Sequence, residues 1–484
     1  MSNGLYAIPK SWHWTTMGEI SAVVGGGTPR TADLTNFEGG TIPWVTPADL
    51  SGYSSKYISH GERSITQKGL ETSSARMLPA GTVLFTSRAP IGYIAIASNP
   101  VCTNQGFKSF VLKDDVVPDY VYWWLKGNKE LTESLASGTT FLELSGAKAK
   151  LIPIPIAPLD EQKRIVAEVE KQFSRLDEVV ASLKRAKANL KRYKSAVLKA
   201  ALEGKLTEQW HIEHPDVEPA EKLLKRILTE RRKKFEQADF ARMPPKEKKP
   251  KDNKAKIKYR EPVPPDYTTL PALPKGWCWS STDQLFWFVT SGSRGWAKYY
   301  SNSGAIFLRV GNVDHDTIAL DLKDIQRVDP PENAERTRTR VETNDILISI
   351  TADVGMVAVV PYEFEEAYIN QHISLARPVS VIESPYLGWY LAARPGQMQF
   401  RELQRGATKA GLGLDDIRSI NIPLPPLEEQ KEIVSQIERR LSIAHELNQD
   451  LDVNLRRAER LRQSILKKAF SGRLVLQIKN QSPN

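Results

Sequence analysis

The sequence of 484 residues contains only two cysteines, Cys102 and Cys278, which cannot supply a framework of several disulfides. Histidines are also few. His211 and His214 have a spacing seen in metal sites, but no third ligand completes the set, so we expect no metal site. No run approaches the roughly 18 apolar residues that a membrane helix needs. The first ten residues lack the apolar core of a secretory signal. We therefore expect a cytoplasmic protein.

The common catalytic motifs are missing as well. The sequence has no G-x-x-x-x-G-K-[ST] phosphate loop. Residues 329–332 read D-P-P-E, and glutamate cannot stack on a flipped base as the aromatic residue of adenine methyltransferases does. Glu161-Gln162-Lys163 and Glu429-Gln430-Lys431 match the E-x-K of nucleases. Both triplets are predicted to open helices, where acids complement the helix dipole. The glycine-rich residues 25–29 are interpreted as a turn. We expect no catalytic site in this chain.

The charge is unevenly distributed. The net charge is +10, yet residues 222–260 alone hold 16 Lys or Arg and 5 Asp or Glu, so the remainder is close to neutral. Residues 220–237 are predicted to form a basic helix with Leu223, Leu224, Ile227 and Leu228 on one face. Residues 243–274 are rich in Lys and Pro, which is typical of a flexible linker. We interpret this region as a solvated tether whose charge can add non-specific attraction to DNA.

The chain is a tandem repeat. Residues 154–170 return as residues 422–438, with 10 of 17 positions identical. The same offset relates Gly138 and Thr140 to Gly406 and Thr408. Each copy has about 200 residues, which indicates an ancestral duplication and not a solenoid of short repeats.

The most similar part of each copy is predicted to be a long helix. Pro158 precedes Asp160 and Glu161 at its start, and Gly204 follows its end. A helix over residues 159–202 would be roughly 66 Å long. Apolar residues step by three and four along it, as in a heptad seam. The seam residues are Val166, Val169, Phe173, Leu176, Val180, Leu183 and Leu190 in the first copy, and Val434, Ile437, Leu441, Leu451 and Leu455 in the second.

Such a stripe needs a partner, and the other copy is the obvious one. Polar residues interrupt the seam at Lys187, Lys194, Asn448 and Arg462, which restricts register and partner. We favour an antiparallel coiled coil within one molecule over two helices packed separately on their own domains. Two related globular parts on such a pair give a pseudo-two-fold monomer. Since DNA half-sites have this symmetry and the two parts have diverged, the expected target is bipartite and asymmetric.

The globular parts are predicted to be α+β. Short β-rich runs lie within residues 83–97 and 345–360, and residues 118–126 and 385–393 are predicted to be short helices rich in Tyr and Trp. The predicted organisation is a recognition domain over 1–150, a helix over 151–206, a basic linker over 207–270, a second recognition domain over 271–420, a second helix over 421–476 and a tail over 477–484.

The repeated I-P-[IL]-x-P-L-x-E-Q-K-x-I-V motif resembles the specificity (S) subunits of type I restriction–modification enzymes. Residues 25–29 (GGGTP), 87–92 (SRAPIG) and 103–107 (TNQGF) resemble further motifs of that family, and residues 291–296 and 369–372 look like motifs of another recognition-domain class. The resemblance covers residues 5–475 in the family's order.

The resemblance implies that each globular part is a target recognition domain for one half of a split double-stranded DNA site. The coiled coil would set the spacer and bind two modification (M) subunits, which methylate adenine N6 with S-adenosylmethionine. Motor-nuclease restriction (R) subunits would join to cut unmodified DNA, and ATP and Mg are expected in the partner subunits. The chain itself would then be non-catalytic and hold no cofactor.

Base-edge contacts must read the sequence, while Lys and Arg position the phosphates. Residues 43–49 and 307–312 are equivalent but divergent. The candidate DNA contacts are Lys56, Arg63, Lys68, Arg76 and Arg88 in the first domain, and Arg294, Lys298, Arg309, Asn312, Arg336, Arg338 and Arg340 in the second. Arg88 and Asn104 belong to the general family pattern, which leaves a structural role open for both.

Two alternatives remain at this point. A stand-alone DNA-binding regulator or architectural protein would bind without M subunits, although no helix-turn-helix pattern supports it. A catalytic methyltransferase or nuclease would bind S-adenosylmethionine or cut DNA on its own.

Overall fold

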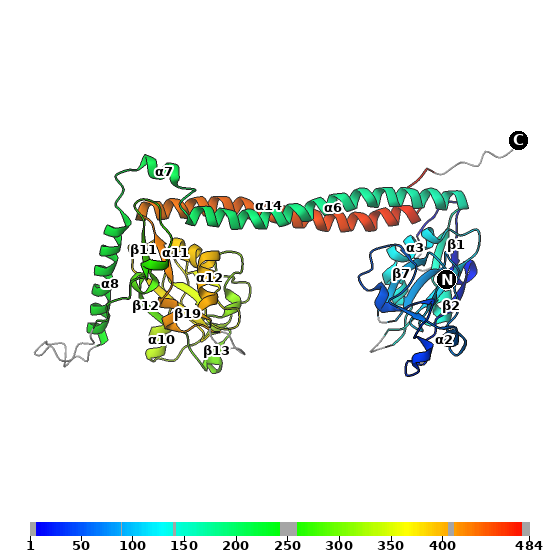
Figure 1. The fold of residues 1–484 in the computed structure, drawn as a ribbon, viewed down its shortest axis with the longest axis horizontal. Helices are drawn as coiled ribbons and strands as arrows, with labels where there is room; N and C mark the ends of the chain where they lie inside the picture. The colour runs from blue at the N-terminus through cyan, green and yellow to red at the C-terminus, as the bar shows by residue number, and fades with distance from the viewer. Residues whose placement is uncertain (1–5, 89, 139–141, 243–258, 405–410, 477–484) are drawn as a thin grey trace, which may run out of the picture. The chain divides into compact units, whose positions relative to one another are not determined.

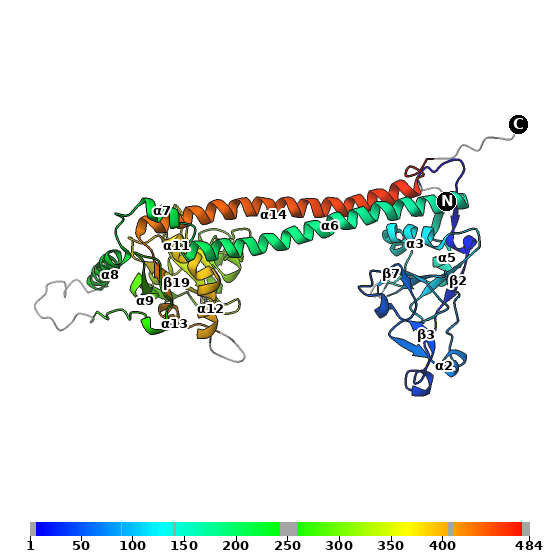
Figure 2. The same cartoon turned by 45° about the horizontal axis from the view of Figure 1, so that its top comes forward.

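The computed structural model describes residues 6–88, 90–138, 142–242, 259–404 and 411–476 (Figures 1 and 2). The chain divides into two compact units. Unit 1 comprises Met1–Ala186 with Asp450–Asn484, and unit 2 comprises Lys187–Gln449. Each unit therefore contains one globular part and a portion of each long helix. The predicted tail, residues 243–258 of the predicted linker and the predicted Thr140–Thr408 match lie outside the described residues.

The described residues of unit 1 form three sheets. Their strand orders are β2-β9-β6-β7-β4, β5-β3-β8 and the antiparallel pair β1-β10. The strands are β1 His13–Thr16, β2 Ser21–Gly25, β3 Ile42–Val45, β4 Tyr57–Ile58, β5 Arg63–Ile65, β6 Val83–Ser87, β7 Ile91–Ala97, β8 Cys102–Thr103, β9 Lys108–Leu112 and β10 Pro153–Ile156. The shorter helices are α1 Met17–Ile20, α2 Gln67–Glu71, α3 Pro118–Gly127, α4 Lys129–Ser134 and α5 Gly146–Lys150.

Unit 2 has the orders β12-β19-β16-β17, β13-β15-β14-β18 and the antiparallel pair β11-β20. The strands are β11 Cys278–Ser281, β12 Phe286–Ser291, β13 Tyr300–Ser301, β14 Ala305–Leu308, β15 Arg327–Val328, β16 Ile346–Ser349, β17 Val357–Val359, β18 Ala367–Ile369, β19 Ile373–Pro378 and β20 Asn421–Leu424. The shorter helices are α7 Glu208–Glu213, α8 Ala220–Arg242, α9 Thr282–Leu285, α10 Ala334–Thr339, α11 Ser384–Ala392, α12 Arg394–Leu403 and α13 Leu414–Arg418.

The two globular parts share one topology. The order β2-β9-β6-β7 of unit 1 matches β12-β19-β16-β17 of unit 2, and β5-β3-β8 matches β15-β14-β18. In both second sheets the central strand pairs parallel with its last neighbour and antiparallel with the other. The helices α3 and α11, rich in Tyr and Trp, follow the main sheet in each unit. The predicted α+β duplication is confirmed.

The long helices begin and end as the sequence predicts. They are α6 Leu159–Leu202 and α14 Leu427–Phe470. Gly204 and Gly472 follow them with φ of +74° and +70°, a left-handed conformation that glycine adopts without steric cost. Both helices thus stop at a glycine two residues beyond their last helical position.

The helices pair antiparallel through the predicted seam. In unit 1 the beginning of α6 shares one buried core with the end of α14, including Val169, Phe173 and Ile465. In unit 2 the end of α6 packs with the beginning of α14 in the same way. Every predicted seam residue is buried or half-buried. The alternative of two separately packed helices is therefore wrong. The polar seam residue Arg462 forms an ion pair with Asp177 and lies over the ring of Phe173.

The predicted basic helix is also present, as α8. Leu223 and Ile227 are fully buried in the core of unit 2, and Leu224 packs against that core. The chain returns at Tyr259, whose hydroxyl accepts a hydrogen bond from Arg231 Nη1 at 2.7 Å. Within the described ranges, no helix has the length and apolarity that crossing a membrane requires.

Candidate nucleic-acid interface

The repeated motif fastens each globular part to its long helix. Gln162 lies in the first turn of α6, where its Oε1 accepts a hydrogen bond from the backbone N–H of Val117 at 3.0 Å, just before α3. Gln430 accepts one from the N–H of Glu383 at 3.1 Å, just before α11. Because both glutamines are buried, these bonds fix where α3 and α11 begin relative to the long helices.

The glutamate of the repeated E-Q-K triplet does more than complement the helix dipole. The interpretation of these triplets as helix starts alone is therefore incomplete. Glu429 is buried in the first turn of α14. Its carboxylate accepts hydrogen bonds from Thr207 Oγ1 and Trp277 Nε1, each at 2.9 Å, and lies 3.2 Å from His211 Nδ1. A buried carboxylate is stable only with such partners. Glu429 therefore holds the segment after α6 and the start of the second globular part against α14.

The glycine-rich segment is not a turn, contrary to our prediction. Gly25 ends β2, and the chain then passes residues 103–107 without a turn, with Gly27 N donating to Thr103 O at 2.8 Å. A Cβ on Gly26 would lie 1.9 Å from Asn104 O. In unit 2 a Cβ on Gly292 would lie 2.0 Å from Asn370 O. The glycines thus allow the two family motifs to pack backbone to backbone in both units.

Four of the first-domain candidates present cationic groups at the surface. Arg63 is exposed at the start of β5, and its guanidinium lies 4.2 Å from the centre of the Phe37 ring. Such stacking holds the head group in place while leaving its N–H groups available. Arg76 is exposed and Arg88 is half-exposed after β6. Lys68 is exposed but pairs with Asp33 at 3.0 Å.

Lys56 is placed differently. Its ammonium forms ion pairs with Asp119 at the start of α3 and with Glu170 on α6, and its side chain is only 18% exposed. Burial lowers the pKa of Lys56, but the two carboxylates outweigh it and raise the pKa above its usual value. A DNA contact by Lys56 remains a prediction, and it would require breaking both ion pairs.

The second-domain candidates fall into two groups. Arg294, Lys298 and Arg340 are exposed, and the ammonium of Lys298 lies 5.0 Å from the centre of the Tyr299 ring. Arg309 is partly exposed and pairs with the exposed Asp324 at 3.1 Å. These four cations can reach a ligand without loss of a buried interaction.

Asn312, Arg336 and Arg338 are engaged within their own domain, so a DNA contact by any of them stays a prediction that would require breaking these contacts. Asn312 is 2% exposed, and its amide accepts from Arg309 N and donates to the carbonyls of residues 321 and 324, which leaves no group for a base edge. Arg336 donates to Tyr368 Oη at 2.9 Å and pairs with Glu332 and Glu366. Arg338 donates to Thr290 Oγ1 and to a backbone carbonyl. All three side chains are used to hold their own domain together.

Sequence reasoning missed several residues that the structure brings out. The positioning roles of Gln162, Gln430 and Trp277 were not predicted. The sequence did contain a sign of the glutamine role, because the same position of the repeated motif is glutamine in both copies. Tyr300 is 43% exposed beside the Arg294–Lys298 segment, and the aromatic–basic sequence there was the signal for it. Nowhere in the described part of the chain do three His, Cys, Asp or Glu side chains gather as metal ligands.

Comparison with known proteins agrees with this arrangement. The family model described as "Type I restriction modification DNA specificity domain" matches residues 9–192 and 332–455. The MjaIX specificity subunit of Methanocaldococcus jannaschii is 42% identical over 214 residues, which span 44% of this chain but only 46% of that relative. The EcoBI specificity subunit of Escherichia coli is 23% identical over 490 residues, 100% of this chain and 90% of that protein.

Solved structures share the fold. A chain from a type I restriction–modification system has a TM-score of 0.67 and 20% identity, and the alignment covers 97% of this chain and 100% of that chain. The HsdS subunit of Thermoanaerobacter tengcongensis has a TM-score of 0.54 and 20% identity, covering 98% and 100%. With a family match over more than half of its length and this fold, the chain belongs to the family of type I restriction–modification specificity subunits.

Proposed function

We propose that this chain is the non-catalytic subunit that selects the DNA target of a type I restriction–modification complex. Each globular part reads one half of a bipartite, asymmetric site, and the α6–α14 pair sets the spacing between the halves. The observation that carries the proposal is one topology used twice with different exposed side chains. Arg63 stacks on Phe37 in unit 1, whereas Arg294 and Lys298 occupy the exposed loop after β12 in unit 2.

The helix pair is also the proposed platform for two M subunits, with R subunits joining the assembly. In this division of labour S-adenosylmethionine binds to the M subunits, and ATP and Mg bind to the R subunits. The seam leaves long exposed flanks on α6 and α14 that a partner can cover. The supporting argument is that both helices are anchored to their globular parts by buried side chains such as Gln162 and Glu429. A rigid platform loses little conformational entropy when a partner binds.

The test is a methylation assay on genomic DNA with the purified chain, the purified M subunit and the two together. We expect adenine methylation at one asymmetric split site only when both are present. Methylation by the chain alone would contradict the non-catalytic assignment. Complete site-specific binding by the chain without M subunits would instead identify a stand-alone DNA-binding regulator.

A further inference from the structure

Helix α8 is a docked part of unit 2 and not a tether. Its 23 residues lie along the second globular part (Figure 1). Ala220, Leu223 and Ile227 form a fully buried stripe. Arg231 donates to Phe286 O at 3.2 Å and pairs with Asp283 at 3.3 Å. These contacts fix the rotation of the helix, and therefore the side that it turns to solvent.

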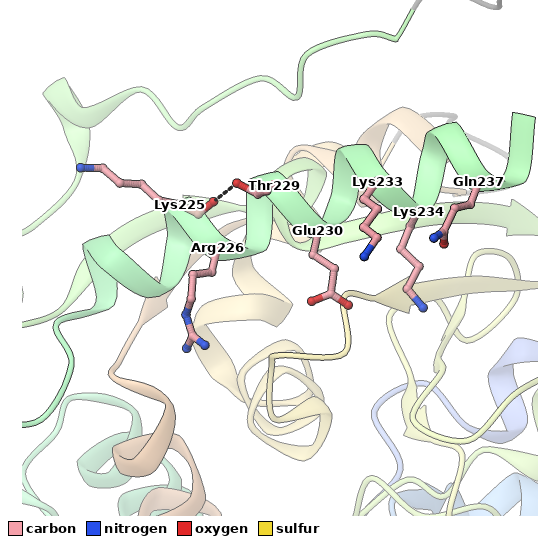
Figure 3. Close-up of a pocket in the computed structure, with 7 residues that line it drawn as sticks. All are labelled: Lys225, Arg226, Thr229, Glu230, Lys233, Lys234 and Gln237. Atoms are coloured by element: carbon pink, nitrogen blue, oxygen red, sulfur yellow. Dashed lines mark hydrogen bonds between the residues drawn. The ribbon is translucent and has the colours of Figure 1, made fainter.

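The helix as a whole is strongly basic. Seven Lys or Arg and three Glu lie between Ala220 and Ala238, and of these cations Arg231 lies on the docked side. Lys222, Lys225 and Lys233 are exposed and Lys234 is half-exposed. In Figure 3 Lys233 and Lys234 project to the same side as Glu230, whereas Lys225 projects in another direction. With 3.6 residues per turn, the four lysines cover a broad arc of the helix, and we call them together the α8 basic face.

The charges of the α8 basic face are not neutralised internally. Arg226 pairs with Glu218 and Arg232 with Glu236 and Glu261. By contrast, none of the four lysines has an ion-pair partner among the residues that the structure describes. Four lysines without an ion-pair partner on one docked helix give this part of unit 2 a positive potential that attracts anions.

The composition of this side distinguishes between a nucleic-acid partner and a protein partner. The cores of protein interfaces are rich in aromatic residues and Met and poor in Lys. Between residues 220 and 238 no large hydrophobic side chain is exposed, because Leu224, Leu228 and Phe235 turn inward and are half-buried. Lysine is a point charge on a flexible stem, suited to phosphates and unsuited to the bidentate reading of a base edge.

The spacing agrees with a phosphate backbone. Residues 222 to 234 span roughly 18 Å along the helix. Each DNA strand presents one phosphate per about 3.4 Å of helix axis. Several phosphates of one strand therefore lie within reach of the four lysines.

We propose that the α8 basic face binds the phosphates of duplex DNA that flanks the second half-site, without regard to sequence. The inference rests on the proposed function, since it assumes that unit 2 lies on DNA. It adds a phosphate-binding site outside the recognition loops, on the segment that joins the two copies of the repeat.

The experiment compares the wild-type chain with a K222Q/K225Q/K233Q/K234Q variant, each assembled with the M subunit. Glutamine keeps the helix propensity of lysine. Two duplexes carry the site found by methylation mapping: a core duplex, and one extended by about 20 base pairs, roughly two helical turns, beyond the second half-site. A matched control neutralises Lys205, Lys275, Arg394 and Arg401, which are exposed elsewhere in unit 2 and lie outside α6 and α14. A Lys-to-Arg variant of the same four positions keeps the charge.

When the salt concentration rises from about 50 mM to about 200 mM, each phosphate contact adds a roughly 3-fold loss of DNA affinity. If two contacts are lost, the variant should show a roughly 10-fold smaller salt effect than wild type on the extended duplex. On the core duplex, the glutamine variant should show the same salt dependence as wild type. The matched control and the Lys-to-Arg variant should show the wild-type salt dependence on both duplexes.

Three outcomes overturn the inference. If wild type binds the core duplex, but variant and wild type show equal salt dependence on the extended duplex, the α8 site is refuted. The proposed function would not be affected by that result. Weakened assembly with the M subunit at unchanged DNA affinity identifies a protein-docking surface instead. A wild-type assembly that binds neither duplex refutes the proposed function, and the inference with it.

Discussion

The indole Nε1 of Trp277 donates a hydrogen bond of 2.9 Å to Glu429 Oε2 and thereby joins the start of the second globular part to the first turn of α14. The other oxygen of the carboxylate accepts from Thr207 Oγ1, in the segment that follows α6. One buried side chain thus connects three separate segments of unit 2. This explains why a motif that looks like a simple helix start carries a glutamate in both copies of the repeat.

Glu429→Ala should destabilise unit 2, because it leaves the Trp277 N–H and the Thr207 hydroxyl buried without an acceptor. We expect a loss of about 2–4 kcal/mol in the free energy of unfolding. The measurement is urea denaturation followed by tryptophan fluorescence. The neighbouring Glu428→Ala is the matched control. Glu428 is exposed and forms a surface ion pair with Lys431, so its removal should cost about 0.5 kcal/mol or less. Equal effects of the two substitutions would contradict the role given to Glu429.

Arg377→Met should produce a pH-dependent loss of stability. Asp345 is fully buried, and Arg377 binds its two carboxylate oxygens at 2.7 and 2.8 Å. Burial raises the pKa of Asp345 to about 6 even though the ion pair opposes this shift. Without Arg377 burial remains the largest effect and the Glu342 charge adds to it, while the hydrogen bond from Glu342 N still opposes it, so the folded state should favour the protonated acid more strongly.

The sign of the pH effect follows from proton linkage. A folded-state pKa above the unfolded value gives stability that is present at low pH and lost as the pH rises through the folded pKa. The Arg377→Met variant should therefore lose about 3–5 kcal/mol near pH 8 and clearly less near pH 5. Asp345→Asn/Arg377→Met should recover much of the loss and show no such dependence. A deficit that is constant from about pH 5 to about pH 8 would show that Asp345 is not the responsible group.

Leu183→Pro tests the helix pair. Leu183 is half-buried in the middle of the α6 seam. Proline there removes a backbone hydrogen bond and clashes one turn back, at a cost of about 3 kcal/mol or more. We expect loss of assembly with the M subunit on a sizing column, together with loss of methylation. Leu183→Ala, which keeps the helix, should retain assembly. Normal assembly and methylation by the proline variant would refute the platform.

Much of this fold could be predicted from the sequence, since its signals are local. Pro158 and Gly204 mark the ends of α6, and the heptad pattern identifies the seam. The parallel pairing of β3 with β8 could not be predicted, because it joins residues far apart in the chain. The candidate site was harder still. Asn312 and Arg336 looked available in sequence, but burial and internal pairing are tertiary properties that charge and residue type do not reveal.

The exposed arginines should affect one half-site each. Arg63→Ala should relax base preference only in the half read by unit 1, and Arg294→Ala only in the half read by unit 2. An arginine that reads guanine contributes about 1–3 kcal/mol of discrimination. Methylation maps of cells expressing each variant with the M subunit provide the measurement. Relaxation of both halves by a single substitution would contradict separate readers.

The most direct test of the central claim uses a fragment of residues 1–206, which contains one recognition domain and one long helix. Two copies can pair through the α6 seam in place of α14, although Lys187 and Lys194 then meet new neighbours and should weaken the pairing. The fragment is coexpressed with the M subunit, and the methylated sites are sequenced. One domain per half-site predicts a palindrome, with the first half-site repeated in inverted orientation around a spacer. Recovery of the original asymmetric site from this fragment would contradict the assignment of one half-site to each domain.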